Sequence, residues 1–400
     1  MDKPQQKASR FLAKMFFYNL LKFLNLFVPK NKKIWIFGER NGTKFDGNCK
    51  YFYLYILKNH KEISPIWLSA KNEIVEQVST QGGKAYRFNT LRAIYYGLIA
   101  KLYIVSHGDM LDVGHYAMRG AKVVNLWHGL PTKKQRNDSQ IESVRFSSIE
   151  RIVRKLTKWL TYHDLKATFD ILTSTSELTK EKRKYYFPKT QNIVITGEPR
   201  NEIFYEKPDK LAFLSKINAS DFRDRKIITY MPTFRDIKSD FKPVFTQFGE
   251  FLEKNQAIIL VKSHPNEEFS AAKIQFNSNA VINISKIHVD VQELLANTDI
   301  LITDYSSCFF DFLLSGKPEI FYPYDREEYF QYEEFLYNYD EVTPGPKVYN
   351  ESDLMLEIEK YLMNPLKDKE QRETIRQKFF EHNDSKACER IYTEILKILC

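Results

Sequence analysis

Short apolar runs alternate with helical patterns along most of this chain, and this alternation constrains the fold more than any other feature. The first half holds such runs at residues 34–38, 65–69, 102–107, 122–128, 171–176 and 193–197. The second half holds them at residues 227–231, 258–263, 281–284, 300–303 and 319–322. Strands that alternate with helices form parallel sheets covered on both faces, so the pattern predicts an α/β fold.

The length of the chain predicts two domains, because its 400 residues exceed the roughly 250 to 300 that one core usually supports. We expect a Rossmann-like domain over residues 31–205 and a second one over residues 227–364. Residues 206–226 are polar and rich in charge, so we place a linker there. Residues 365–400 read as helices that can cross back to the first domain.

The first thirty residues predict an amphipathic helix. On a helical wheel, the polar side chains fall within one arc of about 120°, and Phe, Leu, Met and Val fill the rest. The polar residues are Lys7, Arg10, Lys14, Tyr18, Lys22 and Asn25. A narrow cationic face beside a broad apolar face suits the surface of an anionic membrane, which we expect residues 7–33 to contact. Docking on the protein itself or on a second subunit is the alternative.

Charge and cysteine content narrow the classes of partner. The net charge of +9 favours an anionic partner, but no zinc-finger, helix-turn-helix or RNA-binding motif is present, so we expect no nucleic acid. The four cysteines are scattered, which predicts neither a disulfide framework nor a zinc site and favours the cytosol. No motif for a metal or a cofactor is found, and we expect neither.

Residues at the carboxyl ends of the expected strands are candidates for chemistry, since ligands of open parallel sheets bind there. His128 ends one strand, between Trp127 and Gly129, and an imidazole there can take a proton from a hydroxyl. A structural role for this histidine is the alternative. The basic stretch that begins with Lys133 and Lys134 has nine Lys and Arg residues against four Asp and Glu over residues 133–166. It is a solvated helix face, a membrane patch or an anionic acceptor site.

Other strand ends carry groups that suit a phosphate. Arg200 and Arg235 follow strands of different domains, and arginine binds phosphate through two parallel hydrogen bonds. Ser306 and Ser307 follow Asp304 where a strand gives way to a helix, and two hydroxyls beside free amides can hold a phosphate. A simple helix cap at these serines explains the segment equally well.

Taken in chain order, these motifs resemble the CDP-glycerol glycerophosphotransferase family of teichoic acid primases and polymerases. The resemblance covers about residues 100–350 and rests on Trp127-His128-Gly129 with the two lysines and on residues 197–201, 231–235, 262–265, 299–307 and 321–346. The chain departs from the family pattern at residues 130–132, where Leu-Pro-Thr replaces Thr-Pro-Leu, and at Glu198, where an aromatic residue is common.

This resemblance implies a GT-B-like fold, with two Rossmann-type domains that face a central cleft, on the cytoplasmic face of the cell membrane. The implied reaction moves glycerol phosphate or ribitol phosphate from CDP-glycerol or CDP-ribitol to a hydroxyl of a lipid-linked saccharide or growing polymer. CMP is released, and the product is a teichoic acid or a capsule polymer.

Site residues follow from the same resemblance. His128 is the implied general base, and His264 is the second catalytic residue. The implied donor site consists of Arg200, Thr233, Arg235, His264, Asp304, Ser306 and Ser307, and the implied acceptor side of Trp127, Gly129, Lys133 and Lys134. A glycosyltransferase that uses a nucleotide sugar and a non-catalytic cationic protein that binds membranes or polymers are the alternatives. A second copy of the chain is a further candidate partner.

Overall fold

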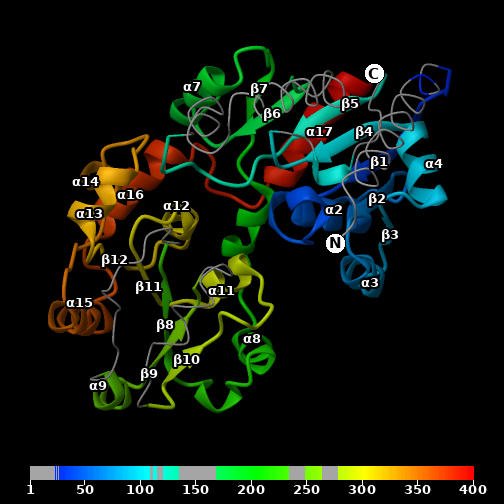
Figure 1. Ribbon diagram of the computed structural model, residues 1–400. Helices are drawn as coiled ribbons and strands as arrows, with labels where there is room; N and C mark the ends of the chain where they lie inside the picture. The colour runs from blue at the N-terminus through cyan, green and yellow to red at the C-terminus, as the bar shows by residue number, and fades with distance from the viewer. Residues whose placement is uncertain are drawn as a thin grey trace, which may run out of the picture. The chain divides into compact units, whose positions relative to one another are not determined.

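The computed structural model describes Phe23, Asn25 and residues 27–108, 111–114, 120–134, 168–233, 248–263 and 278–400 (Figure 1). The chain divides into two compact units. The first consists of Met1–His128, Arg136–Arg200 and Lys386–Cys400, and the second of Gly129–Gln135 and Asn201–Ser385. Most of the amphipathic helix that we expect over residues 1–30 lies outside the described residues.

The first unit contains a seven-stranded sheet in the order β3-β2-β1-β4-β5-β6-β7, and every neighbouring pair is parallel. The strands are β1 (Asn31–Phe37), β2 (Ser64–Ser69), β3 (Lys84–Arg87), β4 (Ala100–Val105), β5 (Lys122–Asn125), β6 (Ile171–Ser174) and β7 (Ile193–Ile195). Its helices are α2 (Gly47–Asn59), α3 (Asn72–Thr80), α4 (Leu91–Ile99), α7 (Glu177–Tyr186) and α17 (Ala387–Leu399). Two short 3-10 turns are η1 (Arg40–Gly42) and η2 (Leu111–Val113).

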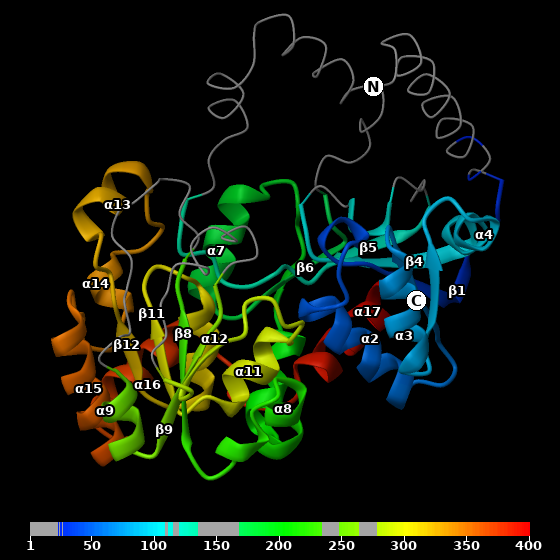
Figure 2. The ribbon, with the colours of Figure 1, turned by 60° about the horizontal axis from the view of Figure 1, so that its bottom comes forward.

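Both faces of this sheet are buried, as the near-continuous apolar strands require. Trp35 and Phe37 of β1 point into one core, which also receives side chains of α2, α3 and α17. Ile34 and Ile36, which alternate with them, point into a second core on the other face, where Ala93 of α4 packs. Helices α2 and α17 lie side by side although they come from opposite ends of the chain (Figures 1 and 2).

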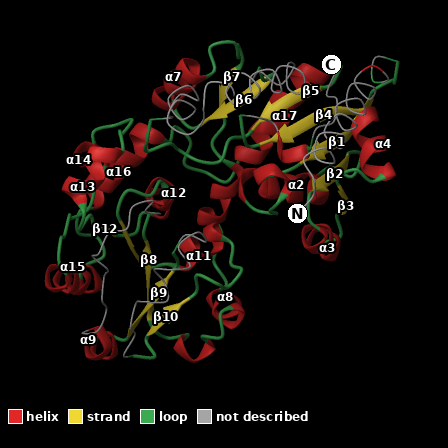
Figure 3. Cartoon of the chain, viewed as in Figure 1, coloured by secondary structure: helices red, strands yellow, loops and turns green. Residues whose placement is uncertain are grey.

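The second unit contains a five-stranded parallel sheet in the order β10-β9-β8-β11-β12 (Figure 3). Its strands are β8 (Lys226–Met231), β9 (Ala257–Val261), β10 (Val281–Asn283), β11 (Ile300–Thr303) and β12 (Glu319–Phe321). Its helices are α8 (Lys210–Lys216), α9 (Phe248–Lys254), α11 (Val291–Asn297), α12 (Cys308–Phe312), α13 (Arg326–Tyr332), α14 (Tyr339–Val342), α15 (Glu351–Met363) and α16 (Lys369–Phe379). The 3-10 turns η4 (Ser220–Phe222) and η6 (Leu313–Ser315) also belong to it, and η3 (Pro199–Tyr205) begins in the first unit and ends in the second.

Two parallel sheets alternating with helices confirm the predicted α/β fold, and all eleven predicted apolar runs form strands. Strand β3 was not predicted, because it is a four-residue edge strand whose Lys84 and Arg87 are exposed. The expected linker also differs from the structure. Residues 206–226 contain α8, whose Phe213 and Leu214 are fully buried in the core of the second unit, so this segment is part of that unit.

Each sheet has one point where the strand order reverses, and ligands of such sheets bind at the carboxyl ends of the strands on either side of it. In the first sheet this point lies between β1 and β4, and in the second it lies between β8 and β11. Most of the predicted site residues of the described chain lie in segments that follow these strands or their neighbours, whereas Arg200 follows the edge strand β7.

Candidate active site

Polar side chains meet where β1, β4 and β5 end in the first unit. Glu39 follows β1, Ser106 and His107 follow β4, and His128 follows β5, while Asp112 comes from η2. The Nδ1 atom of His128 lies 2.9 Å from the carbonyl oxygen of Ser106. The rings of His107 and His128 are stacked, with centroids 4.5 Å apart and planes 10° from parallel.

A tight turn presents His128. Trp127 has a φ of 58° and Gly129 a φ of 121°, so the backbone leaves the strand through left-handed conformations on both sides of the histidine. For a bulky residue such as Trp127 this conformation costs on the order of 1–3 kcal/mol. The side-chain amide of Asn48 offsets part of that cost by donating to the carbonyl oxygens of Leu126 and Trp127, at 3.1 and 3.0 Å.

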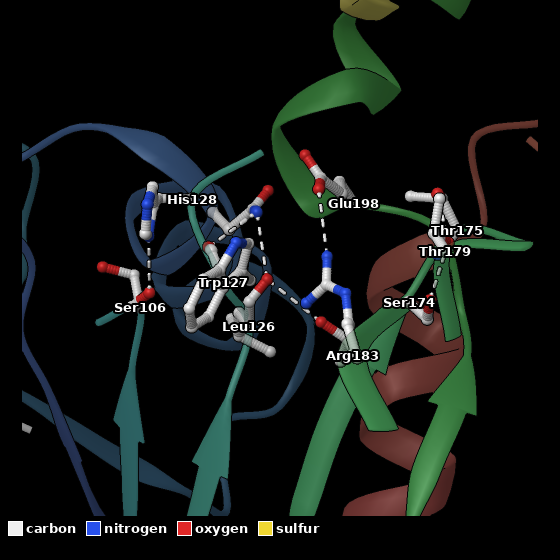
Figure 4. A network of polar contacts seen from close by, with 12 residues as sticks. Ser106, Leu126, Trp127, His128, Ser174, Thr175, Thr179, Arg183 and Glu198 are labelled. Carbon is white, nitrogen blue, oxygen red and sulfur yellow. Dashed lines mark hydrogen bonds and ion pairs between the residues drawn. The ribbon is translucent and has the colours of Figure 1, made fainter. Parts of the chain in front are cut away.

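Two arginines and a buried carboxylate support the same turn, and Figure 4 shows one of these arginines, Arg183, directed at the carboxylate of Glu198. The guanidinium of Arg200 donates to the carbonyl oxygen of His128 at 3.1 Å, and its Nε lies 3.0 Å from Glu198. Arg183 lies 3.9 Å from the other oxygen of Glu198 and 5.6 Å from the centre of the Trp127 ring. Arg200 is therefore directed at the backbone of the histidine that we expected to be the base.

The surroundings of His128 favour a neutral imidazole. Burial, the charge of His107 and the charges of Arg200 and Arg40 lower the pKa of His128 to about 4, against the opposing hydrogen bond to Ser106. Part of the residue is open to solvent, which screens these charges. Because Nδ1 donates to a carbonyl, Nε2 carries the lone pair, and an unprotonated Nε2 is suited to accept a proton.

The two carboxylates beneath the histidines have opposite pKa shifts. Burial and the nearby Asp112 and Asp46 raise the pKa of Glu39 to about 8, although its hydrogen bond with Ser106 opposes this. Burial alone would also raise the pKa of Asp112, but hydrogen bonds from His107, Asn41 and Ser106 and the charge of His107 lower it below its usual value. At neutral pH the pair therefore consists of one protonated and one ionised carboxyl group.

A second polar centre lies in the second unit, where β8 and β11 end. One carboxylate oxygen of Asp304 accepts hydrogen bonds from the amide and hydroxyl of Thr233, at 2.8 and 2.6 Å, and from the amide of Tyr305 at 2.5 Å. The hydroxyl of Tyr339 donates to the carbonyl oxygen of Asp304 at 2.9 Å. Asp304 thus ties together the two segments in which we expected donor-binding residues.

Ser306 and Ser307 follow directly, at the start of α12, and both are half-buried. The hydroxyl of Ser306 accepts a long hydrogen bond of 3.5 Å from the amide of Cys308. Ser307 stands at the capping position, yet its side chain makes no capping hydrogen bond. Helix capping therefore involves only one long hydrogen bond to Ser306 and does not involve the side chain of Ser307.

The two acceptor-side lysines belong to the second unit, whereas His128 belongs to the first. Lys133 donates to the hydroxyl of Tyr329 and lies 4.9 Å from the centre of that ring, and Lys134 forms an ion pair of 2.9 Å with Glu334. Their backbone pairs with the strand-like segment at Phe335. Both lysines thus anchor the segment that follows Gly129.

Two predicted donor residues, Arg235 and His264, lie outside the described residues. Conversely, the structure brings Glu39, Asp112 and Asn48 to the candidate site, although no sequence motif identified them. The one feature of the sequence that could have identified Glu39 is its position after an apolar strand, which it shares with His107 and His128. Over the described ranges, no group of three or more His, Cys, Asp and Glu side chains is arranged to hold a metal ion.

Comparisons with known proteins extend the picture. A teichoic acid poly(ribitol-phosphate) polymerase of Bacillus spizizenii is 27% identical over 98% of this chain and 61% of that protein. A teichoic acid glycerol-phosphate transferase of Staphylococcus aureus is 26% identical over 92% of this chain and 94% of that protein. The chain therefore spans less than two thirds of the first relative and nearly all of the second. Among solved structures, the wall teichoic acid polymerase TagF superposes with a TM-score of 0.72 at 23% identity, over 98% of this chain and 97% of that one.

These likenesses confirm both the GT-B-like fold class and the family resemblance. Residues 20–397, almost the whole chain, match the family described as CDP-glycerol:poly(glycerophosphate) glycerophosphotransferase. The chain belongs to this family of CDP-glycerol:poly(glycerophosphate) glycerophosphotransferases.

Proposed function

We propose that this chain transfers glycerol phosphate or ribitol phosphate from a CDP-activated donor to a hydroxyl group and releases CMP. The observation that carries the proposal is the geometry of His128, whose Nδ1 donates to a backbone carbonyl and thereby leaves the lone pair on Nε2, which can act as a base. Family membership supplies the class of donor. The relatives named above act on both ribitol phosphate and glycerol phosphate, so either polyol fits.

In this mechanism Nε2 of His128 accepts the proton of the acceptor hydroxyl. The resulting oxygen attacks the β-phosphorus of the donor, a new P–O bond forms, and the bond between that phosphorus and the bridging oxygen breaks. CMP leaves with the electron pair of that bond. Phosphoryl transfer of this kind depends on positioning and on stabilisation of charge, and it needs no covalent enzyme intermediate.

We assign the donor to the second unit, around the segments that Asp304 joins. Thr233 and Tyr305 are held by this carboxylate, and the hydroxyls of Ser306 and Ser307 lie beside the start of α12. Arg235 and His264 complete the assignment on the strength of the sequence motifs. Support for a CDP donor also comes from TagF, of which one solved structure is a histidine variant soaked with CDPG.

The test is a CMP-release assay with CDP-glycerol, CDP-ribitol and nucleotide sugars, in which mass spectrometry measures the product. We expect CMP from a CDP-polyol only, and we expect His128→Ala to lower kcat by about 10²- to 10⁴-fold. The control is His288→Ala, since His288 is exposed in the second unit and belongs to neither polar centre. Nucleotide release from sugars alone would indicate a glycosyltransferase, and no release from any donor would indicate a binding protein.

The proposal includes peripheral attachment to the cytoplasmic face of the cell membrane and a lipid-linked saccharide or polymer as the acceptor. Within the part of the chain that the structure describes, no helix is both long and apolar enough to span a bilayer. Phe23 and Phe27 support attachment, because they are 57% and 72% exposed and pack edge to face at 5.4 Å. Lys30 holds this segment to α4 through hydrogen bonds of 2.5 Å to Leu98 and to Asn25.

Co-sedimentation with vesicles that contain an anionic lipid tests the attachment. The double variant Phe23→Ser/Phe27→Ser should bind these vesicles more weakly than the native protein. A matched control is Tyr185→Ser, since Tyr185 is an aromatic residue of α7 that is 79% exposed. Equal binding by the native protein and the double variant would contradict the role of residues 7–33.

A further inference from the structure

The imidazole of His107 lies between the carboxylate of Asp112 and the ring of His128. Its Nδ1 lies 3.1 and 3.3 Å from the two oxygens of Asp112 and 2.8 Å from the hydroxyl of Ser106. Its ring stacks on that of His128 at 4.5 Å. The mechanism proposed above uses His128 and leaves His107 without a role.

Asp112 is built to remain ionised. Its side chain is fully buried, and its two oxygens accept hydrogen bonds from the amides of Asn41, Ser106 and His107 at 2.8, 2.8 and 2.9 Å. Three amide donors stabilise a carboxylate strongly, and a buried carboxylate in turn stabilises a cation beside it.

His107 therefore carries a positive charge more readily than an ordinary histidine. Burial opposes this, but the hydrogen bond to Asp112 and the charges of Asp112 and Glu39 raise the pKa of His107 above its usual value, while Arg40 acts in the other direction. Asp112 contributes more to this effect than Glu39, because the pKa of Glu39 is itself raised to about 8 and its charge is present mainly above that pH.

We propose that His107 and Asp112 form a fixed ion pair that keeps His128 unprotonated, so that this pair sets the lower pH limit at which the base can act. His107 is then a positioning residue, since it acts on the reaction through His128. This inference rests on the proposed function only for the role of His128 as the base.

The other charged groups around His128 do not replace the pair. Arg200 donates to the backbone carbonyl of His128, and Arg40 comes from η1. The positive charges of both arginines disfavour protonation of the His128 ring. The hydrogen bond to Ser106 has the opposite effect. His107 is the cation whose ring contacts that of His128 directly, so its removal has the largest expected effect.

An NMR titration of the histidine ring signals, assigned with a His128→Asn variant, tests the pairing without any turnover. In the native protein we expect His107 to titrate above its ordinary midpoint and His128 below it. In His107→Gln the midpoint of His128 should rise by roughly one pH unit, the size expected for a unit charge at this separation in a site open to water. His60→Gln is the control, because His60 stacks on Tyr392 at 3.7 Å and does not contact the pair.

The pH dependence of kcat/KM then connects the pair to the reaction. The acid limb for CMP release should move upward in His107→Gln by the same amount as the NMR midpoint of His128. An unchanged midpoint for His128 in that variant would overturn the inference, and so would a native His128 that titrates at or above its ordinary midpoint. A shifted midpoint with an unshifted acid limb would instead overturn the base role of His128 and with it the proposed function.

Discussion

Replacing Glu198 by glutamine should destabilise the first unit more than any change of a surface charge. The Glu198 side chain is 1% exposed and lies between the guanidinium groups of Arg200, at 3.0 Å, and Arg183, at 3.9 Å. These two arginine side chains are only 13% and 6% exposed. Glu198→Gln keeps the shape of the side chain and removes the negative charge that lies between the two arginines.

The magnitude follows from burial. Removing one partner of a buried ion pair costs about 3–5 kcal/mol, because the charge left behind is neither solvated nor paired. In a unit of this size each kcal/mol lowers Tm by about 2–4 °C, so we expect a decrease on the order of 10 °C. Activity should also fall, since Arg200 holds the carbonyl of His128.

Thermal unfolding followed by circular dichroism measures the effect. The matched control is Glu177→Gln, which removes a surface ion pair with Lys180 of 2.9 Å in which the glutamate is 66% exposed. This control should cost at most about 1 kcal/mol. The double variant Glu198→Gln/Arg183→Met should recover part of the loss, because it also removes one of the two buried charges. A Tm for Glu198→Gln as high as that of the control would refute the reasoning.

Three further predictions follow from the same structure. Asn48→Ala removes the two hydrogen bonds to the turn before His128 and one of 3.2 Å from the amide of Arg200. We expect kcat for CMP release to fall at least about tenfold and the free energy of unfolding to drop by about 1–3 kcal/mol. A native kcat would contradict the role of the turn. Asp304→Asn should raise KM for the CDP donor about tenfold and leave the NMR titration of His128 unchanged, and a native KM would argue against a donor site there. Burial raises the pKa of Glu319 well above its usual value, against the opposing charge of Arg372, so the native state loses stability as the pH rises above the pKa that Glu319 has in the unfolded chain. The urea midpoint of Glu319→Gln should therefore match that of the native protein near pH 5 and exceed it near pH 9. Equal midpoints at both pH values would count against the raised pKa.

The fold could be predicted from the sequence because most of the strands contain an apolar run whose residues are largely buried. In β9 (Ala257–Val261) all five residues are buried, and this run is recognisable without knowledge of its neighbours. Strand β3 has no such run, since its pairing with β2 and not its own burial defines it. Residues 206–226 show the same limit, because Phe213 and Leu214 are the only two buried residues of a short helix in a polar segment.

The candidate site could be predicted only in part. Trp127, His128 and Gly129 are consecutive and end a strand, so position and residue type together indicated a reactive turn. The ion pair of Arg183 with Glu198 joins α7 to the segment after β7, and the hydrogen bonds of Asn48 join segments far apart in the sequence. Such contacts depend on how the strands and helices pack, and the spacing of residues along one chain does not contain that information.

The charge states of Glu39 and Asp112 show why packing decides chemistry at this site. Both are buried carboxyl groups beside His107, and their residue types alone would give them similar pKa values. Asp112 accepts three short amide hydrogen bonds, whereas Glu39 accepts one amide hydrogen bond, of 3.4 Å from Cys49, and one from the Ser106 hydroxyl. Asp112 is therefore ionised and Glu39 protonated at neutral pH, since a buried carboxylate needs several hydrogen-bond donors to offset the loss of water. The net charge beneath the two histidines is thus set by the number of amides that η1 and the end of β4 direct at each carboxyl group.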